Sequence, residues 1–76
     1  MKCPIEKIKN ENDWTIQDVA ILADISSTAA YRTIKGESRE INPSVLKALQ
    51  VKGYDTEELK ANYREYRQKR REKLLS

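Results

Sequence analysis

The spacing of apolar positions along the chain predicts five helices. Apolar residues recur three and four positions apart, which is typical of amphipathic helices and not of strands. Polar stretches with helix-capping residues interrupt this pattern four times. The first helix is expected over about residues 4–10, and the others begin near Thr15, Ser26, Asn42 and Asp55. Two glycines and two prolines in 76 residues are too few for an all-β design, so we expect an all-α domain.

The second and third predicted helices are separated by only about three residues. Thr15 and Asp18 have the spacing of a capping box at the start of the second helix. Its expected buried side is Ile16, Val19, Ala20, Leu22 and Ala23. Asp24 lies where the turn requires a left-handed residue, which Asp tolerates, and Ser26 then caps the third helix. Two helices joined by so short a turn form a helix-turn-helix.

The third predicted helix, within SSTAAYRTIKG (26–36), divides into two sides when its residues are placed about 100° apart. The small, mostly apolar side consists of Ala29, Ala30, Thr33 and Ile34. The other side carries hydrogen-bonding groups on Ser27, Thr28, Tyr31, Arg32 and Lys35. Gly36 is expected to end the helix. We expect the first side to pack on the domain and the second to face a partner.

The fourth predicted helix begins with Asn42 as cap and Pro43 in its first position, and it ends at Gly53. Its inward side chains are expected to be Val45, Leu46, Ala48 and Leu49. The fifth begins at Asp55 or Thr56. Acidic residues in its first turn and cations near its end complement the helix dipole.

The fifth predicted helix carries most of the positive charge. Its apolar line of Leu59, Tyr63 and Tyr66 ends where Arg70 stands, so the first half is expected to pack and the second half to project. Residues 60–73 hold seven cations and two anions, a net charge of +5, whereas the rest of the chain has −2. A basic segment of this kind suits nucleic acid, an acidic protein or anionic lipid, and the plain alternative is a solvated helix.

The composition argues against catalysis and metal binding. Cys3 is the only cysteine and histidine is absent, so an internal disulfide is ruled out, a structural zinc site is not expected, and Cys3 is expected to be an idle thiol. We expect neither an enzyme nor a cofactor. No stretch approaches the roughly 18 apolar residues of a membrane span. MKCPIEKIKN (1–10) lacks the apolar core of a signal peptide, so we expect a cytoplasmic protein without a membrane partner.

A helix-turn-helix suggests double-stranded DNA as the partner, because its second helix can enter the major groove and contact base edges. The side chains expected to contact bases are Ser27, Thr28, Tyr31 and Arg32. The planar fork of Arg32 suits the two acceptors of guanine. The residues expected at backbone phosphates are Thr15, Gln17, Lys35, Arg39, Lys69, Arg70 and Arg71.

The stretch TIQDVAILADISSTAAYRTIKG (15–36) resembles the helix-turn-helix of the lambda-repressor-like superfamily. The lac-repressor-like branch is suggested by TIQDVAILADIS (15–26) and VLKALQVKGY (45–54). The phage-repressor, Cro-like branch is suggested by an extra helix before Trp14 and by the fourth and fifth helices. The resemblance covers residues 5 to about 60 and implies the same four base contacts. It also implies packing positions at Val19, Ala20, Ile25 and Ala30.

Several residues depart from the pattern of that superfamily. Asp24 replaces the usual turn glycine, and Thr33 stands where a larger apolar residue is normal. Ile16 occupies the place of a phosphate-binding Gln in phage repressors, and Gln17 is a possible substitute. The segment 36–45 is shorter than in lac-type repressors, and no sugar-binding domain follows, so we expect no small-molecule effector domain.

These observations together predict a four- to five-helix lambda-repressor-like protein, with a helix-turn-helix domain over 1–55 and a basic C-terminal helix over 56–76. We expect a sequence-specific DNA-binding regulator, a repressor of phage or mobile-element type, that acts as a homodimer. The possible dimer contacts are Leu59, Tyr63, Tyr66, Leu74 and Leu75. The basic helix could instead follow flanking phosphates on DNA bound by one chain. The alternatives are an adaptor that captures a partner protein and an RNA-binding protein that uses the tail.

Overall fold

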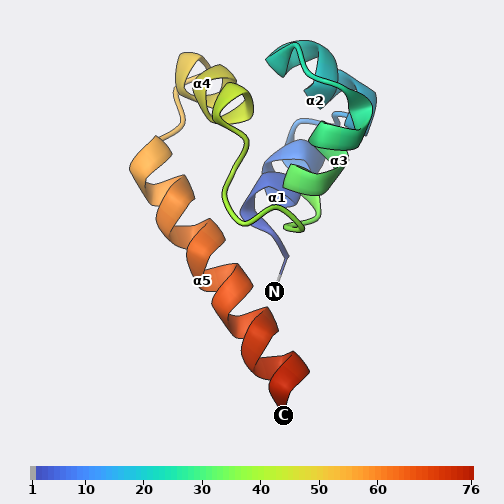
Figure 1. The fold of residues 1–76 in the computed structure, drawn as a ribbon. Coiled ribbons are helices and arrows are strands. Elements are labelled where there is room, and N and C mark those ends of the chain that lie inside the picture. The colour runs from blue at the N-terminus through green and yellow to red at the C-terminus, as the bar shows by residue number, and fades with distance from the viewer. Residues whose placement is uncertain (1) are drawn as a thin grey trace.

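The structure, a computed structural model, describes residues 2–76. It contains five helices: α1 (Pro4–Glu11), α2 (Ile16–Ala23), α3 (Ser27–Ile34), α4 (Pro43–Val51) and α5 (Thr56–Leu75). No strand occurs within this described range. In Figure 1, α1 to α4 gather together, while α5 runs past them and its C-terminal end stands clear. The prediction of an all-α chain with five helices is therefore confirmed, although α1 ends one residue later than expected.

Local hydrogen bonds explain where α2 and α3 begin. Thr15 Oγ1 accepts from the Asp18 amide at 3.1 Å, and Asp18 Oδ2 accepts from the Thr15 amide at 2.9 Å. Ser26 Oγ accepts from the Ala29 amide at 3.1 Å. Caps of this kind contribute about 1 kcal/mol each. Between the helices, Asp24 adopts φ 55° and ψ 51°, the left-handed conformation expected for the turn.

The core is formed by small and aliphatic side chains from every helix together with one tyrosine. Its buried members are Cys3, Ile5, Ile8, Val19, Ala20, Ala23, Ala30, Ile34, Ile41, Val45, Leu49, Leu59 and Tyr63. Trp14, Ile16 and Ile25 pack against this cluster at its edge. Leu22, expected on the buried side of α2, is instead 38% exposed. Helix α1 lies against α3 and α5, while α2 lies against α3 and α4.

Thr33 is fully buried, and the structure explains why a hydroxyl stands in that position. Its Oγ1 accepts from the Asn42 amide at 3.3 Å, directly before α4. Its carbonyl oxygen accepts from Cys3 Sγ at 3.6 Å. Each buried side-chain nitrogen and oxygen within residues 2–76 has a hydrogen-bond partner. Thr33 therefore links α3 to the start of α4 and to the N-terminal segment.

Helix α5 is held against the loop that follows α3 by three neighbouring contacts. Tyr63 Oη donates to the Ser38 carbonyl at 2.6 Å. The Tyr66 ring lies against Gly36, where a Cβ would come within 2.5 Å of Tyr66 Cε2. Arg67 Nη1 donates to the Gly36 carbonyl. From residue 68 onward every residue is exposed, which confirms that the first half packs and the second half projects.

Candidate nucleic-acid interface

The two sides of α3 have opposite surroundings, as expected. Ala30, Thr33 and Ile34 are buried in the core. The other side, which we call the α3 face, consists of Ser27, Thr28, Tyr31, Arg32 and Lys35, all of them exposed. Because the apolar side fixes the helix on the domain, the hydrogen-bonding groups of the α3 face are presented to solvent on a rigid element.

A side-chain contact connects the first turns of α2 and α3. Ser27 Oγ donates to Gln17 Oε1 at 2.8 Å, so the structure brings together one residue expected at bases and one expected at phosphate. The Thr15 amide is used by the Asp18 carboxylate, so this amide is not free for a phosphate. The hydroxyl of Thr15 accepts from the Asp18 amide and keeps its own hydrogen available.

At the other end of the α3 face, Lys35 is paired with Glu6 of α1, with 2.6 Å between Nζ and Oε2. The hydrogen bond from Lys35 to Glu6, together with the attraction of that carboxylate, raises the pKa of Lys35 above its ordinary value. Lys35 therefore stays charged at neutral pH, but Glu6 balances part of its charge.

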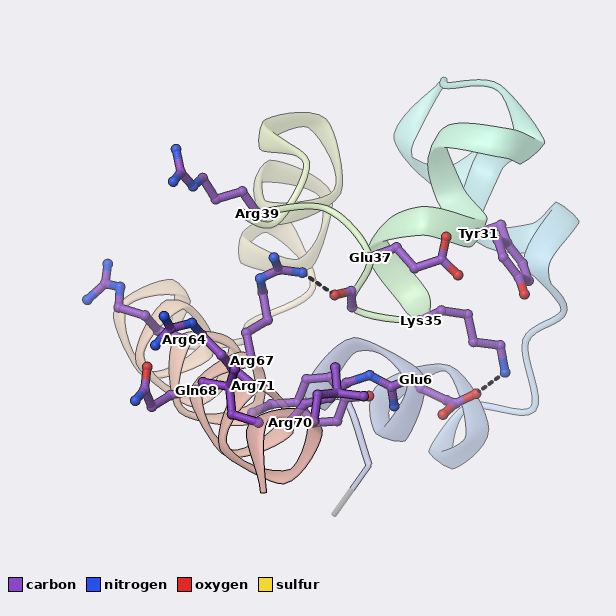
Figure 2. Close-up of a pocket in the computed structure, with 14 residues that line it drawn as sticks. Glu6, Tyr31, Lys35, Glu37, Arg39, Arg64, Arg67, Gln68, Arg70 and Arg71 are labelled. Atoms are coloured by element: carbon purple, nitrogen blue, oxygen red, sulfur yellow. Dashed lines mark hydrogen bonds and ion pairs between the residues drawn. The ribbon is translucent and has the colours of Figure 1, made fainter.

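A wide groove begins beside Lys35 and continues along α5. Its volume is about 1160 Å³. Figure 2 shows α5 side chains on one flank and residues of the loop after α3 on the other. The groove is lined by six cationic side chains: Lys35, Arg39, Arg64, Arg67, Arg70 and Arg71. Two carboxylates, on Glu6 and Glu37, also line it, so its net charge is positive. We call it the basic groove.

Four of the five cations expected at phosphates line the basic groove, and one does not. Arg39, Arg70 and Arg71 line the basic groove together with Lys35. Lys69 does not line the groove, and its Nζ is 3.2 Å from Glu65 Oε1 of the same helix.

Arg64 and Arg67 also line the groove, although the sequence interpretation did not assign them to the site. Their positions did contain a usable signal. Lys60, Arg64, Arg67 and Arg71 follow one another at spacings of four, three and four, which places them along one stripe of a helix.

The side chains expected at a dimer interface lie in different environments. Leu59 and Tyr63 are only 7% and 2% exposed, because they belong to the core of the single chain. They are therefore not available to a second copy in this fold. Tyr66 is half-buried against Gly36. Leu74 and Leu75, at the end of α5, are 75% and 71% exposed.

Three other features of residues 2–76 concern metal binding, the cysteine and the membrane. Within residues 2–76, no three His, Cys, Asp or Glu side chains are grouped so that they could hold a metal ion. Burial is the main reason that the pKa of the Cys3 thiol is raised, and Cys3 is the one free cysteine. No described helix combines the length and apolar character needed to cross a membrane.

Comparison of the chain with protein-family models, with curated proteins and with solved structures finds no match. The superfamily expected from residues 15–36 therefore stays a prediction.

Proposed function

We propose that this protein is a small cytoplasmic transcriptional regulator, a repressor of phage or mobile-element type, that binds double-stranded DNA with α3 in the major groove. The observation that supports this proposal is the division of α3. One side is sealed into the core, and the α3 face presents five exposed side chains that can form hydrogen bonds. The left-handed residue Asp24 at the end of α2, three residues before α3 begins, agrees with the short turn of a helix-turn-helix.

The roles of the α3 face follow from side-chain length and chemistry. Ser27 and Thr28 lie in the first turn, where short hydroxyls can contact base edges or a thymine methyl group. Arg32 lies one turn later and can donate two hydrogen bonds to guanine O6 and N7. Gln17, already in contact with Ser27, holds this first turn beside the N-terminus of α2, a favourable position for a phosphate.

Two copies of the chain would bind DNA more tightly than one. A single small module buries too little surface for high affinity, and paired half-sites are the usual solution. Leu74 and Leu75 are the exposed apolar side chains of α5 that could contribute to such pairing. A dimer would select a symmetric DNA site, so the symmetry of the site measures this part of the proposal.

The test compares Arg32→Ala and Arg32→Lys with the unchanged protein on a DNA site selected by that protein. Arg32→Ala should weaken binding by about 1–3 kcal/mol and remove the preference at one base pair. Arg32→Lys keeps the charge but loses the planar fork, so it should lose that preference while retaining most binding to unrelated DNA. If Arg32→Ala and Arg32→Lys discriminate among all single-base variants of the site as the unchanged protein does, the assignment of α3 is wrong.

A protein-binding adaptor is the second candidate, and two exposed aliphatic residues favour it. Ile21 on α2 and Val51 on α4 are 69% and 82% exposed. Scattered exposed apolar residues are common, however, and need no partner of their own. An adaptor would show no preference among DNA sequences, so the same binding experiments separate the two candidates.

A further inference from the structure

The basic groove contains arginines that form no ion pair within residues 2–76. Within residues 2–76, ion pairs join Lys35 to Glu6 and join Lys60 and Lys69 to glutamates of their own helix. Arg39, Arg64, Arg70 and Arg71 are exposed and belong to none of these pairs. Four guanidinium groups around one groove repel each other, and a polyanion in the groove would remove that repulsion.

The width of the basic groove is fixed close to the end of α3. Arg67 donates to the Gly36 carbonyl, and Tyr63 donates to the Ser38 carbonyl. These contacts hold α5 to the loop that leaves α3, so the arginines on α5 have a defined position relative to the α3 face. The basic groove and the α3 face also share two residues, Tyr31 and Lys35.

We infer that the basic groove binds the phosphate backbone of the DNA segment that flanks the base pairs contacted by α3. This inference rests on the proposed function and extends the DNA contact of one chain from the major groove onto α5. The guanidinium fork matches two phosphate oxygens at once, which favours arginine over lysine at such a site. Arg64 and Arg71 are seven positions apart on the helix, or about 10 Å, which equals about three phosphate spacings of one strand measured along the duplex axis.

A duplex is favoured over an acidic peptide by continuity. A peptide in the basic groove would meet Lys35 and the arginines but would have no reason to extend onto the α3 face. A DNA strand that borders the major groove would pass from one surface to the other, because Tyr31 and Lys35 belong to both. The same surface therefore predicts contacts that depend on salt but not on base sequence.

The experiment compares two double variants of α5 that each remove two positive charges. Arg70→Gln with Arg71→Gln changes the basic groove, whereas Lys69→Gln with Lys73→Gln changes cations of the same helix that do not line it. All four residues are exposed, and thermal unfolding of both variants checks that the fold is kept. Affinity is measured between 0.05 and 0.3 M salt, values of roughly physiological range, on a duplex with the selected site and on one with an unrelated sequence.

The groove variant should lower the slope of log affinity against log salt by about 1.8, with an affinity loss of about 60-fold at 0.1 M salt on both duplexes. The control variant should change the slope by less than about half of that amount. Equal changes of the salt slope in the two variants would show that the basic groove does not bind phosphates. Shortening the duplex beside the selected site should abolish the difference between the groove variant and the unchanged protein, and an undiminished difference would also contradict the inference.

The two proposals fail in distinguishable ways. If DNA selection yields no sequence preference but the groove variant alone loses salt-sensitive binding, the proposed base recognition by the α3 face is wrong and phosphate binding by the basic groove is supported. If a sequence preference is found and both α5 variants behave alike, the α3 face stands and the basic groove is wrong.

Discussion

Replacing Gly36 with alanine should destabilise the protein through two separable costs. Gly36 has φ +73°, and an L-residue there costs about 1–2 kcal/mol. The new Cβ would also lie 2.5 Å from Tyr66 Cε2 and 3.1 Å from Cδ2, so the ring must move. Forcing such a ring off its preferred rotamer costs about 1 kcal/mol. The total, about 2–3 kcal/mol, corresponds to a fall in Tm of roughly 10–20 °C for a chain of this size.

A double-mutant cycle separates the two costs. Free energies of unfolding in urea are measured for the unchanged protein, Gly36→Ala, Tyr66→Ala and the combination. In the Tyr66→Ala background only the backbone cost is left, so Gly36→Ala should be about 1 kcal/mol less harmful there.

Gly53→Ala provides the matched control for this cycle. Gly53 also has a positive φ, +100°, but no atom lies within 4 Å of its would-be Cβ. Its cost should therefore be the same with and without Tyr66. If Gly36→Ala costs as much in the Tyr66→Ala background as in the unchanged protein, the described packing of α5 on Gly36 is refuted.

Two further substitutions test particular parts of the fold. Burial raises the pKa of Tyr63 to about 12, above its ordinary value of 10.0, so its contribution to stability is complete below pH 10 and is lost as the pH rises through 12. Tyr63→Phe should cost about 1 kcal/mol at neutral pH through the lost hydrogen bond to Ser38, and its urea unfolding should lack this alkaline decline, whereas parallel pH profiles would contradict the burial argument. Asp24→Gly should raise the free energy of unfolding by up to about 1 kcal/mol, because glycine adopts a φ of 55° without strain. A loss of stability would show that the Asp24 side chain contributes more than the backbone argument allows.

The local features of this fold could be predicted because short-range chemistry determines them. Thr15 and Ser26 start helices through bonds to amides three residues later, so sequence spacing alone contains the information. The division of α3 follows from helical periodicity. The left-handed conformation of Asp24 was predictable because aspartate, like asparagine, is one of the few residues besides glycine that adopt it in a turn.

The contacts that build the basic groove could not be predicted, because they join residues far apart in the chain. Tyr63 and Arg67 donate to carbonyl groups that lie 25 and 31 positions earlier. Because every residue has a backbone carbonyl, the sequence does not indicate which one accepts. The periodicity of α5 did show an apolar line at Leu59 and Tyr63, but the same line is expected for a dimer contact and for a core contact. In the structure both side chains are buried in the core of the single chain.

The central claim is that the α3 face recognises a DNA sequence, and selection from random double-stranded DNA tests it most directly. The unchanged protein is used at roughly physiological salt, where binding that depends only on phosphates is weak. We predict enrichment of a defined motif, symmetric if two chains bind together, in which Arg32→Ala loses the preference at one base pair. Enrichment without any motif, for the unchanged protein, would contradict the claim and favour a protein partner.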